Sequence, residues 1–177
     1  MKMFKRFAAA LLAGVMVLAM LTACGGGSGS GTSAVGEEFE NKNIEVINAL
    51  RGENAEKLEN DTDLRNRALA QLEKIKDDGT ITSKEANTSI VTYDADGKPA
   101  TVIMISVGTA NKGEVVDGVC QAKEITPESL GEINKDDVTP DALKGMQALK
   151  RIGIATKVIN GKTYGAVAME ISVPDNA

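Results

Sequence analysis

The fold is decided by the stretch RIGIATKVINGKTYGAVAMEISV, which spans residues 151–173. Two strand-like runs, Ile152–Ile159 and Lys162–Val173, flank the dipeptide Asn160-Gly161. Asn-Gly favours a two-residue type I′ turn, because both turn positions need a positive φ. The sequence therefore predicts an antiparallel β-hairpin over this stretch.

Two amphipathic helices are expected before the strands. The first covers Glu37–Arg51, and the second runs from Asp61, an N-cap residue, to Gly79. The second arm of the hairpin carries small side chains at Ala166 and Ala168, so we expect a helix to pack closely against that face. Apolar residues recur at helical spacing in both helices: Ile44, Ile47 and Leu50 in the first, and Leu64, Ala68, Leu72 and Ile75 in the second.

A second hairpin is expected between Ser89–Tyr93 and Ala100–Val107. Its turn contains Asp94 and Asp96, as a calcium-binding loop would. However, a third acidic ligand is missing, and Ile105 stands where such a loop carries a glutamate. The sequence therefore favours a simple turn.

The remaining segments complete a mixed pattern. Glu114–Ile125 predicts a further strand region. Short helices are expected to begin at Thr126-Pro127-Glu128 and at Thr139-Pro140-Asp141, the latter running through about Leu149, because proline suits the first helical position. Helices first, followed by strands mixed with short helices, are typical of an α+β fold.

The N-terminal segment has the parts of a bacterial lipoprotein signal peptide. Phe7–Leu21 is almost wholly apolar, yet short for a spanning helix of about 20 residues. It ends in Leu21-Thr22-Ala23-Cys24, the pattern at which a precursor receives a diacylglycerol on the cysteine and is cleaved before it. The alternative is an ordinary secretory signal with an unrelated cysteine. Three basic residues precede the apolar run: Lys2, Lys5 and Arg6.

We therefore expect a signal peptide over residues 1–23, a lipidated Cys24 with a Gly/Ser-rich tether over 24–36, and a single domain over 37–177. This arrangement places the chain outside the cytoplasm, lipid-anchored to the outer face of the bacterial cell membrane. Two acyl chains suffice for stable anchoring, at about 0.8 kcal/mol per buried methylene.

The charge and the cysteines narrow the classes of partner. Without residues 1–23 the chain has 17 Lys and Arg against 25 Asp and Glu, a net charge of −8. An acidic chain lacks the electrostatic footprint for nucleic acid or anionic lipid. Lipidation of Cys24 would leave Cys120 alone, and we expect it to be a small buried hydrophobe on a strand rather than a nucleophile.

The chain contains no histidine. This removes the commonest general base, the common catalytic triads and the usual zinc ligand. Aromatic residues are scarce as well, so stacking platforms for sugars or bases are not expected. We expect no cofactor and no metal.

Both ends of the chain resemble the CAP superfamily of cysteine-rich secretory proteins, antigen 5 and pathogenesis-related proteins, in its bacterial form. The resemblance covers about a third of the chain, and the middle matches are weaker. At the start it lies in Ile44–Arg51 (IEVINALR), Leu58–Asp61 and Leu64–Ile75. At the end it lies in Arg151–Ala155, Asn160-Gly161-Lys162 and Tyr164, and in the middle in Gly113-Glu114-Val115-Val116.

The resemblance implies a three-layer α-β-α sandwich that ends in a β-hairpin. In many members a groove lined by two histidines and two glutamates binds a divalent metal. Glu114 is the counterpart of one such glutamate, and a histidine would fall near Asp141. Without histidine that metal site is not expected to form, which leaves Glu114 and Asp141 as candidate groove residues.

The leading hypothesis is a non-catalytic, membrane-anchored domain that binds a protein, a peptide or a small amphipathic ligand. One alternative is a cell-wall hydrolase that pairs Glu114 with Glu128, Glu132 or Asp141, which requires carboxyls about 5–9.5 Å apart. The other is a structural or inhibitory module. For it, the apolar run Thr101–Val107 would be an interaction site at a sheet edge but plain core in a sheet centre.

Overall fold

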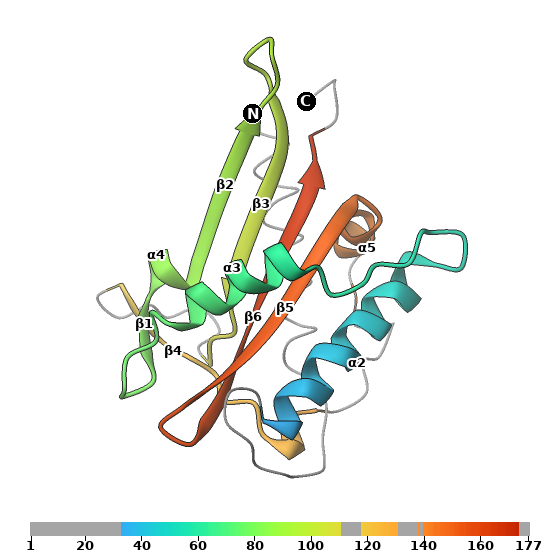
Figure 1. The fold of residues 1–177 in the computed structure, drawn as a ribbon. Coiled ribbons are helices and arrows are strands. Elements are labelled where there is room, and N and C mark those ends of the chain that lie inside the picture. Colours follow the sequence, from blue (N-terminus) through green and yellow to red (C-terminus); the bar gives the residue numbers. More distant parts are fainter. Residues whose placement is uncertain (1–32, 111–117, 131–137, 139, 174–177) are drawn as a thin grey trace.

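The structure, a computed structural model, describes residues 33–110, 118–130, 138 and 140–173 (Figure 1). These residues form a mixed α+β fold in which helices pack against a four-stranded antiparallel sheet of order β2-β3-β6-β5. The strands of this sheet are β2 (Asn87–Tyr93), β3 (Pro99–Val107), β5 (Leu149–Ile159) and β6 (Lys162–Ser172). The helices are α2 (Ala34–Arg51), α3 (Thr62–Leu72), α4 (Ser83–Ala86) and α5 (Pro140–Gln147).

The predicted closing hairpin is confirmed. Strands β5 and β6 pair antiparallel up to Ile159 and Lys162, which flank the two-residue turn. Asn160 has φ 49° and Gly161 has φ 77°, the positive values that a type I′ turn requires. The hairpin supplies the two longest strands of the sheet.

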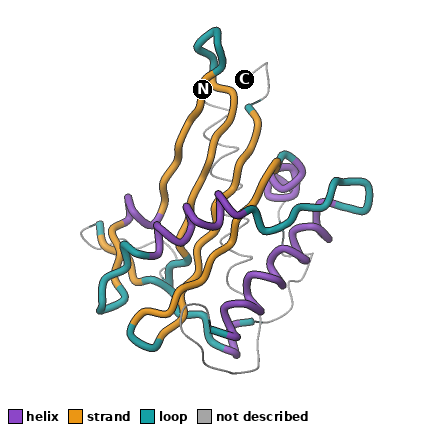
Figure 2. The backbone as a smooth tube through the Cα atoms, in the orientation of Figure 1, coloured by secondary structure: helices purple, strands orange, loops and turns teal. Residues whose placement is uncertain are grey.

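Each face of the sheet carries its own apolar core, because side chains alternate along a strand. One core joins residues of β5 and β6 to α2, and the other joins the intervening residues to α3. Figure 2 shows the second of these helices lying across the strands. The first core includes Phe39, Ile47, Ile152, Ile154, Val167 and Met169, and the second includes Leu64, Ala68, Leu72, Ala155, Ala166 and Ala168.

Close packing of a helix on the small-residue face is confirmed. Ala166 and Ala168 are both buried, in the core that also contains Leu64 of α3. Next to them, Gly153 brings the strand within contact of the helix backbone. A Cβ atom added to Gly153 would lie 2.1 Å from the backbone nitrogen of Arg65.

Three helix boundaries differ from the prediction. Helix α2 begins at Ala34, because the Ser33 hydroxyl accepts a hydrogen bond from the Gly36 amide at 3.0 Å. Helix α3 is capped by Asp61 as predicted, but it ends at Leu72 rather than at Gly79, since the chain continues in tight turns. The predicted last helix is shorter as well, and Leu149 belongs to β5.

Of the region predicted as a strand over Glu114–Ile125, the structure describes residues 118–125, where it has the short strand β4 (Val119–Gln121). Glu114 lies outside the described residues. β4 pairs antiparallel with β1 (Thr80–Thr82), where Ile81 is opposite Cys120. Cys120 is buried, as a small hydrophobe on a strand is expected to be. After β4 a 3₁₀ turn follows at Pro127–Ser129.

The second predicted hairpin is also confirmed, and it settles the environment of the apolar run Thr101–Val107. β3 lies between β2 and β6, so this run is in the sheet interior. Its residues from Val102 onward are buried. The run is therefore core, and the outermost described strand on this side of the sheet is β2 (Figure 1).

Candidate binding surface

Asn48, near the end of α2, binds the loop that follows the helix. The side chain of Asn48 binds both backbone groups of Leu58: its Nδ2 donates to the carbonyl and its Oδ1 accepts from the amide, each at 2.8 Å. An asparagine side chain thus pairs with the backbone as a neighbouring strand would. This fixes the loop between α2 and α3.

Asp61 joins the start of α3 to the hairpin. Its carboxylate accepts the Leu64 amide at 3.0 Å and two hydrogen bonds from Arg151 at 3.0 and 3.1 Å. The Leu64 amide above all, assisted by the Arg151 guanidinium, holds the pKa of Asp61 below its usual value. Asp61 is therefore a capping and bridging residue.

Glu40 is the centre of a buried polar network. Its carboxylate accepts two hydrogen bonds from the Arg65 guanidinium, at 2.9 and 3.1 Å, and one from the side-chain Nδ2 of Asn60 at 3.3 Å. It also accepts the backbone amide and the hydroxyl of Thr156, both at 2.9 Å. The hydrogen bond with Glu40 raises the pKa of Arg65. Because these five bonds occupy both oxygens, Glu40 holds α2, α3 and β5 together.

This network also closes the outer edge of β5. Asn60 donates to the Ile154 carbonyl at 3.0 Å and accepts from its amide at 2.8 Å, while Glu40 takes the amide of Thr156. The amide of Asp61 donates to the Ile152 carbonyl at 2.8 Å. Backbone groups that an edge strand would expose are thus paired within the chain.

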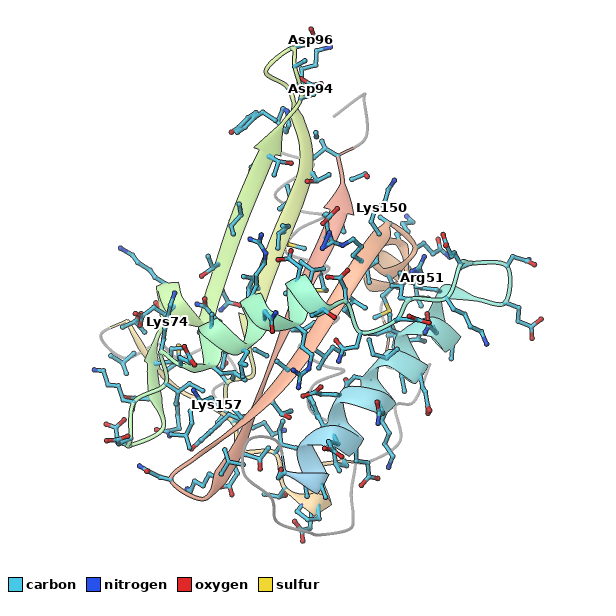
Figure 3. All side chains as sticks on the ribbon, viewed as in Figure 1. Arg51, Lys74, Asp94, Asp96, Lys150 and Lys157 are labelled. Atoms are coloured by element: carbon cyan, nitrogen blue, oxygen red, sulfur yellow. The ribbon has the colours of Figure 1, made fainter. Side chains whose placement is uncertain are left out.

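The opposite edge, β2, has no such cover among the described residues. Its last five residues are exposed, and Ile90, Val91 and Tyr93 expose 39%, 38% and 64% of their surface. None of the seven residues of β2 is charged. The hairpin that contains β2 projects beyond the helices, with Asp94 and Asp96 at its tip (Figure 3).

The turn at this tip is a simple turn, as predicted. The Asp94 carboxylate accepts the backbone amides of Asp96 and Lys98 at 2.9 and 2.8 Å. Gly97 has φ 75° and completes the turn. In the described ranges, no three Cys, Asp or Glu side chains lie close enough together to hold a metal ion.

The candidate groove residues are placed as follows. Cys24 and Glu114 lie outside the described residues. Asp141 is in the first turn of α5, but its side chain is not described. Within the described part, no helix is long and apolar enough to cross a membrane.

Of the further carboxylates weighed for hydrolysis, Glu132 is not described and Glu128 is exposed. Hydrogen bonds from its own backbone amide and from the Thr126 hydroxyl lower the pKa of Glu128. A glycosidase general acid needs a raised pKa, so that it is protonated at the working pH. The environment of Glu128 favours the opposite state.

A hollow of about 550 Å³ lies between α2 and the loop that follows it. Its walls combine small and charged side chains, and its one amide, Asn48, already binds Leu58. The lining residues are Glu45, Asn48, Ala49, Gly52, Glu53, Ala55 and Lys57. The hollow therefore lacks the free, convergent polar groups of a typical small-molecule site.

Arg51, at the end of α2, is a neighbour of this hollow in sequence but does not line it (Figure 3). Its Nε and Nη1 atoms are buried and meet no hydrogen-bond acceptor in the structure as described. Desolvation lowers the pKa of Arg51, against the opposing charge of Glu56. The positive charge suits the C-terminal end of a helix, where the dipole is negative.

The chain was compared with protein-family models, with curated proteins and with solved structures, and none of the three comparisons gave a match. The exposed, uncharged edge of β2 is thus the surface that stands out from the chain's own geometry. Its strand character is readable from the sequence. Its position at a sheet edge is not, because strand order depends on long-range pairing.

Proposed function

We propose that this chain is a lipid-anchored lipoprotein on the outer face of a bacterial cell membrane, with a single non-catalytic domain that binds a partner. The observation that carries the binding role is the exposed, uncharged edge of β2. Among the ligand classes considered, a protein or peptide suits this edge best, because its free backbone groups can pair with another strand.

A non-catalytic role is supported by how the polar side chains are used. The chain has no histidine. Glu40, the buried carboxylate of the network, is saturated by five hydrogen bonds. Asp61 caps α3 and binds Arg151. Groups bound in this way are structural, since a catalytic carboxylate must reach a substrate.

The proposal includes a CAP-like, three-layer α-β-α arrangement. Its support is that α2 and α3 contribute to different cores, which take alternate residues of the same strands. Asn48, Asp61 and Leu64, three of the residues that carry the resemblance, lock α2, α3 and the hairpin together. A retained groove would lie at Glu114 and Asp141.

The anchor is tested by the two cysteines of the chain. Cells that express the full chain are grown with an alkyne-tagged fatty acid, and the label on the protein is measured after gel separation. We expect the label to be lost in Cys24→Ser and kept in the matched variant Cys120→Ser, because only the lipobox cysteine receives lipid. Equal labelling of both variants would contradict the anchor.

The absence of a metal role is tested by titrating the full chain, in detergent, with zinc. We expect the melting temperature to change by less than about 1 °C. A ligand at 100 times its Kd stabilises the folded state by about 2.7 kcal/mol, which raises the melting temperature by several degrees. A saturable rise of that size would mean that the protein binds zinc, and the proposal would need a metal site.

A further inference from the structure

Among the described residues, one outer edge of the sheet is paired with other parts of the chain and the opposite edge is not. Side chains of Asn60 and Glu40 pair with the outer backbone of β5. No described element pairs with the outer side of β2 (Figure 1). We propose that β2 pairs with β2 of a second copy of this chain, antiparallel and about a two-fold axis at Ile90. The inference rests on the binding role proposed above for the β2 edge and names the partner as a second copy of this chain; it is independent of the anchor.

The backbone of β2 is arranged for this pairing. The Val173 amide donates to the Ala100 carbonyl, so the backbone N–H and C=O groups of Ala100 point toward β6. Those of the next residue, Thr101, therefore point toward β2. Thr101 is opposite Thr92, and Ile103 is opposite Ile90. Since hydrogen-bonded pairs alternate along an antiparallel ladder, the backbone groups of Ile90 face β3. Those of Ser89 and Val91 face outward, where a second strand would meet them.

The side chains of β2 are self-complementary about Ile90. Centring the axis on this residue pairs all seven positions of Asn87–Tyr93, because it is the middle one. Ile90 then meets Ile90 of the second copy, Thr88 meets Thr92, and Ser89 meets Val91. Apolar and threonine pairs of this kind stabilise neighbouring strands, and no like charges are opposed.

The charges at the two ends of β2 also match. Asp94 and Asp96, with Lys98, form the tip beyond the strand, and Lys84 lies in α4 just before it. In the antiparallel arrangement, the acidic tip of one copy is at the same end of the strand pair as α4 and Lys84 of the other. Lys74 is exposed on the same side as α4, far from the acidic tip (Figure 3). Glu85 of α4 is bound to Thr82.

An identical strand is the occupant that these observations favour. The chain has a net charge of −5, so two copies repel elsewhere, and an uncharged edge with oppositely charged ends lets them approach. An isologous contact of this kind closes at two copies and leaves β5 covered. The pair would form one continuous eight-stranded sheet.

The test is cysteine cross-linking of the full chain in the membranes of expressing cells. Residues opposite each other on neighbouring antiparallel strands have Cα atoms about 4.5–5.5 Å apart, within the range of a disulfide. We expect Ile90→Cys to yield mostly disulfide-linked dimer on mild oxidation. The wild type is the blank for Cys24 and Cys120, and it should stay monomeric on a non-reducing gel.

Neighbouring positions serve as matched controls. Ser89→Cys and Val91→Cys should each cross-link at least about tenfold less than Ile90→Cys, because neither is opposite itself, whereas co-expression of the two should restore the dimer. Equal cross-linking at all three positions, no dimer at Ile90, or a linked product with the mass of a different protein would each overturn the pairing.

A second measurement, which needs no cysteine variants, is the oligomeric state of the protein in detergent. In detergent, analytical ultracentrifugation of the full chain should give a dimer for the wild type and for Val158→Lys, which adds the same charge on β5. It should give a monomer for Ile90→Lys that keeps the wild-type circular dichroism spectrum. A wild-type monomer across the concentrations of the membrane experiment, or dissociation by Val158→Lys alone, would also overturn it.

Discussion

Replacing Glu40 by alanine is expected to lower the free energy of unfolding by about 3–5 kcal/mol, the cost of breaking a buried ion pair by removing one partner. Glu40 is 7% exposed, and its carboxylate accepts five hydrogen bonds. The variant leaves the Arg65 guanidinium and the buried hydroxyl of Thr156 without these acceptors. It also removes the hydrogen bonds from β5 to α2 that Glu40 accepts from Thr156.

The measurement is urea unfolding followed by circular dichroism, with Glu38→Ala as the matched control. Glu38 is on the same helix and pairs with Lys42 on the surface at 2.7 Å. An exposed pair of this kind contributes at most about 0.5 kcal/mol. If Glu40→Ala and Glu38→Ala unfold at the same urea concentration, the network does not hold the elements together.

Replacing Gly153 by alanine is expected to destabilise the protein by about 3 kcal/mol or more, at the upper end of the cost of overpacking a core. The added methyl group would lie 2.1 Å from the Arg65 nitrogen and 2.3 Å from the Leu64 carbonyl carbon. These are backbone atoms, so no side-chain rotation relieves the clash. Helix α3 must move away from the sheet and open the core beneath it.

The matched control is Gly108→Ala, at the end of β3. A methyl group there has its nearest contact at 3.8 Å, an ordinary van der Waals distance. We expect its melting temperature to stay within about 2 °C of the wild type, while Gly153→Ala falls by roughly 6–12 °C. Equal melting temperatures for the two variants would show that α3 does not approach the strand this closely.

Gly153 and Glu40 show which features the sequence predicts and which it does not. Small side chains on the hairpin predicted a closely packed helix, and Gly153 is the residue that permits the approach. The partners of Glu40 were not predictable, because Asn60, Arg65 and Thr156 are 20, 25 and 116 residues further along the chain. A glutamate at that position in a helix reads from the sequence as an ordinary surface residue.

Helix ends were also harder to predict than helices. Asp61 identifies the start of α3, because a cap is a local hydrogen bond between neighbouring residues. Its end at Leu72 is set instead by the turns that lead into β1, which pairs with β4 some forty residues later. A glycine such as Gly79 marks the last turn before β1 rather than the helix terminus.

The candidate site divides in the same way. Cys24 was predicted from a contiguous lipobox, which needs no tertiary structure to be recognised. Glu114 and Asp141 were carried over from a resemblance, and their relation in space stays a prediction. The sequence predicts β2 as one arm of a hairpin and leaves open whether Thr101–Val107 lies at an edge or in the centre of the sheet. The sheet order places this run in the centre and β2 at the edge.

The sequence by itself determined the local elements: the Asn160-Gly161 turn, the strands on both sides of it, the capped helix after Asp61 and the mixed α+β class. Each depends on residues a few positions apart, whose conformational preferences and hydrogen bonds are local. Only the tertiary structure decided that Glu40 is buried, that β3 is interior and that β2 is the outermost strand of the described sheet. These features depend on contacts between segments that are far apart in the sequence. The order of residues along the chain does not reveal which of two neighbouring strands lies inside the sheet.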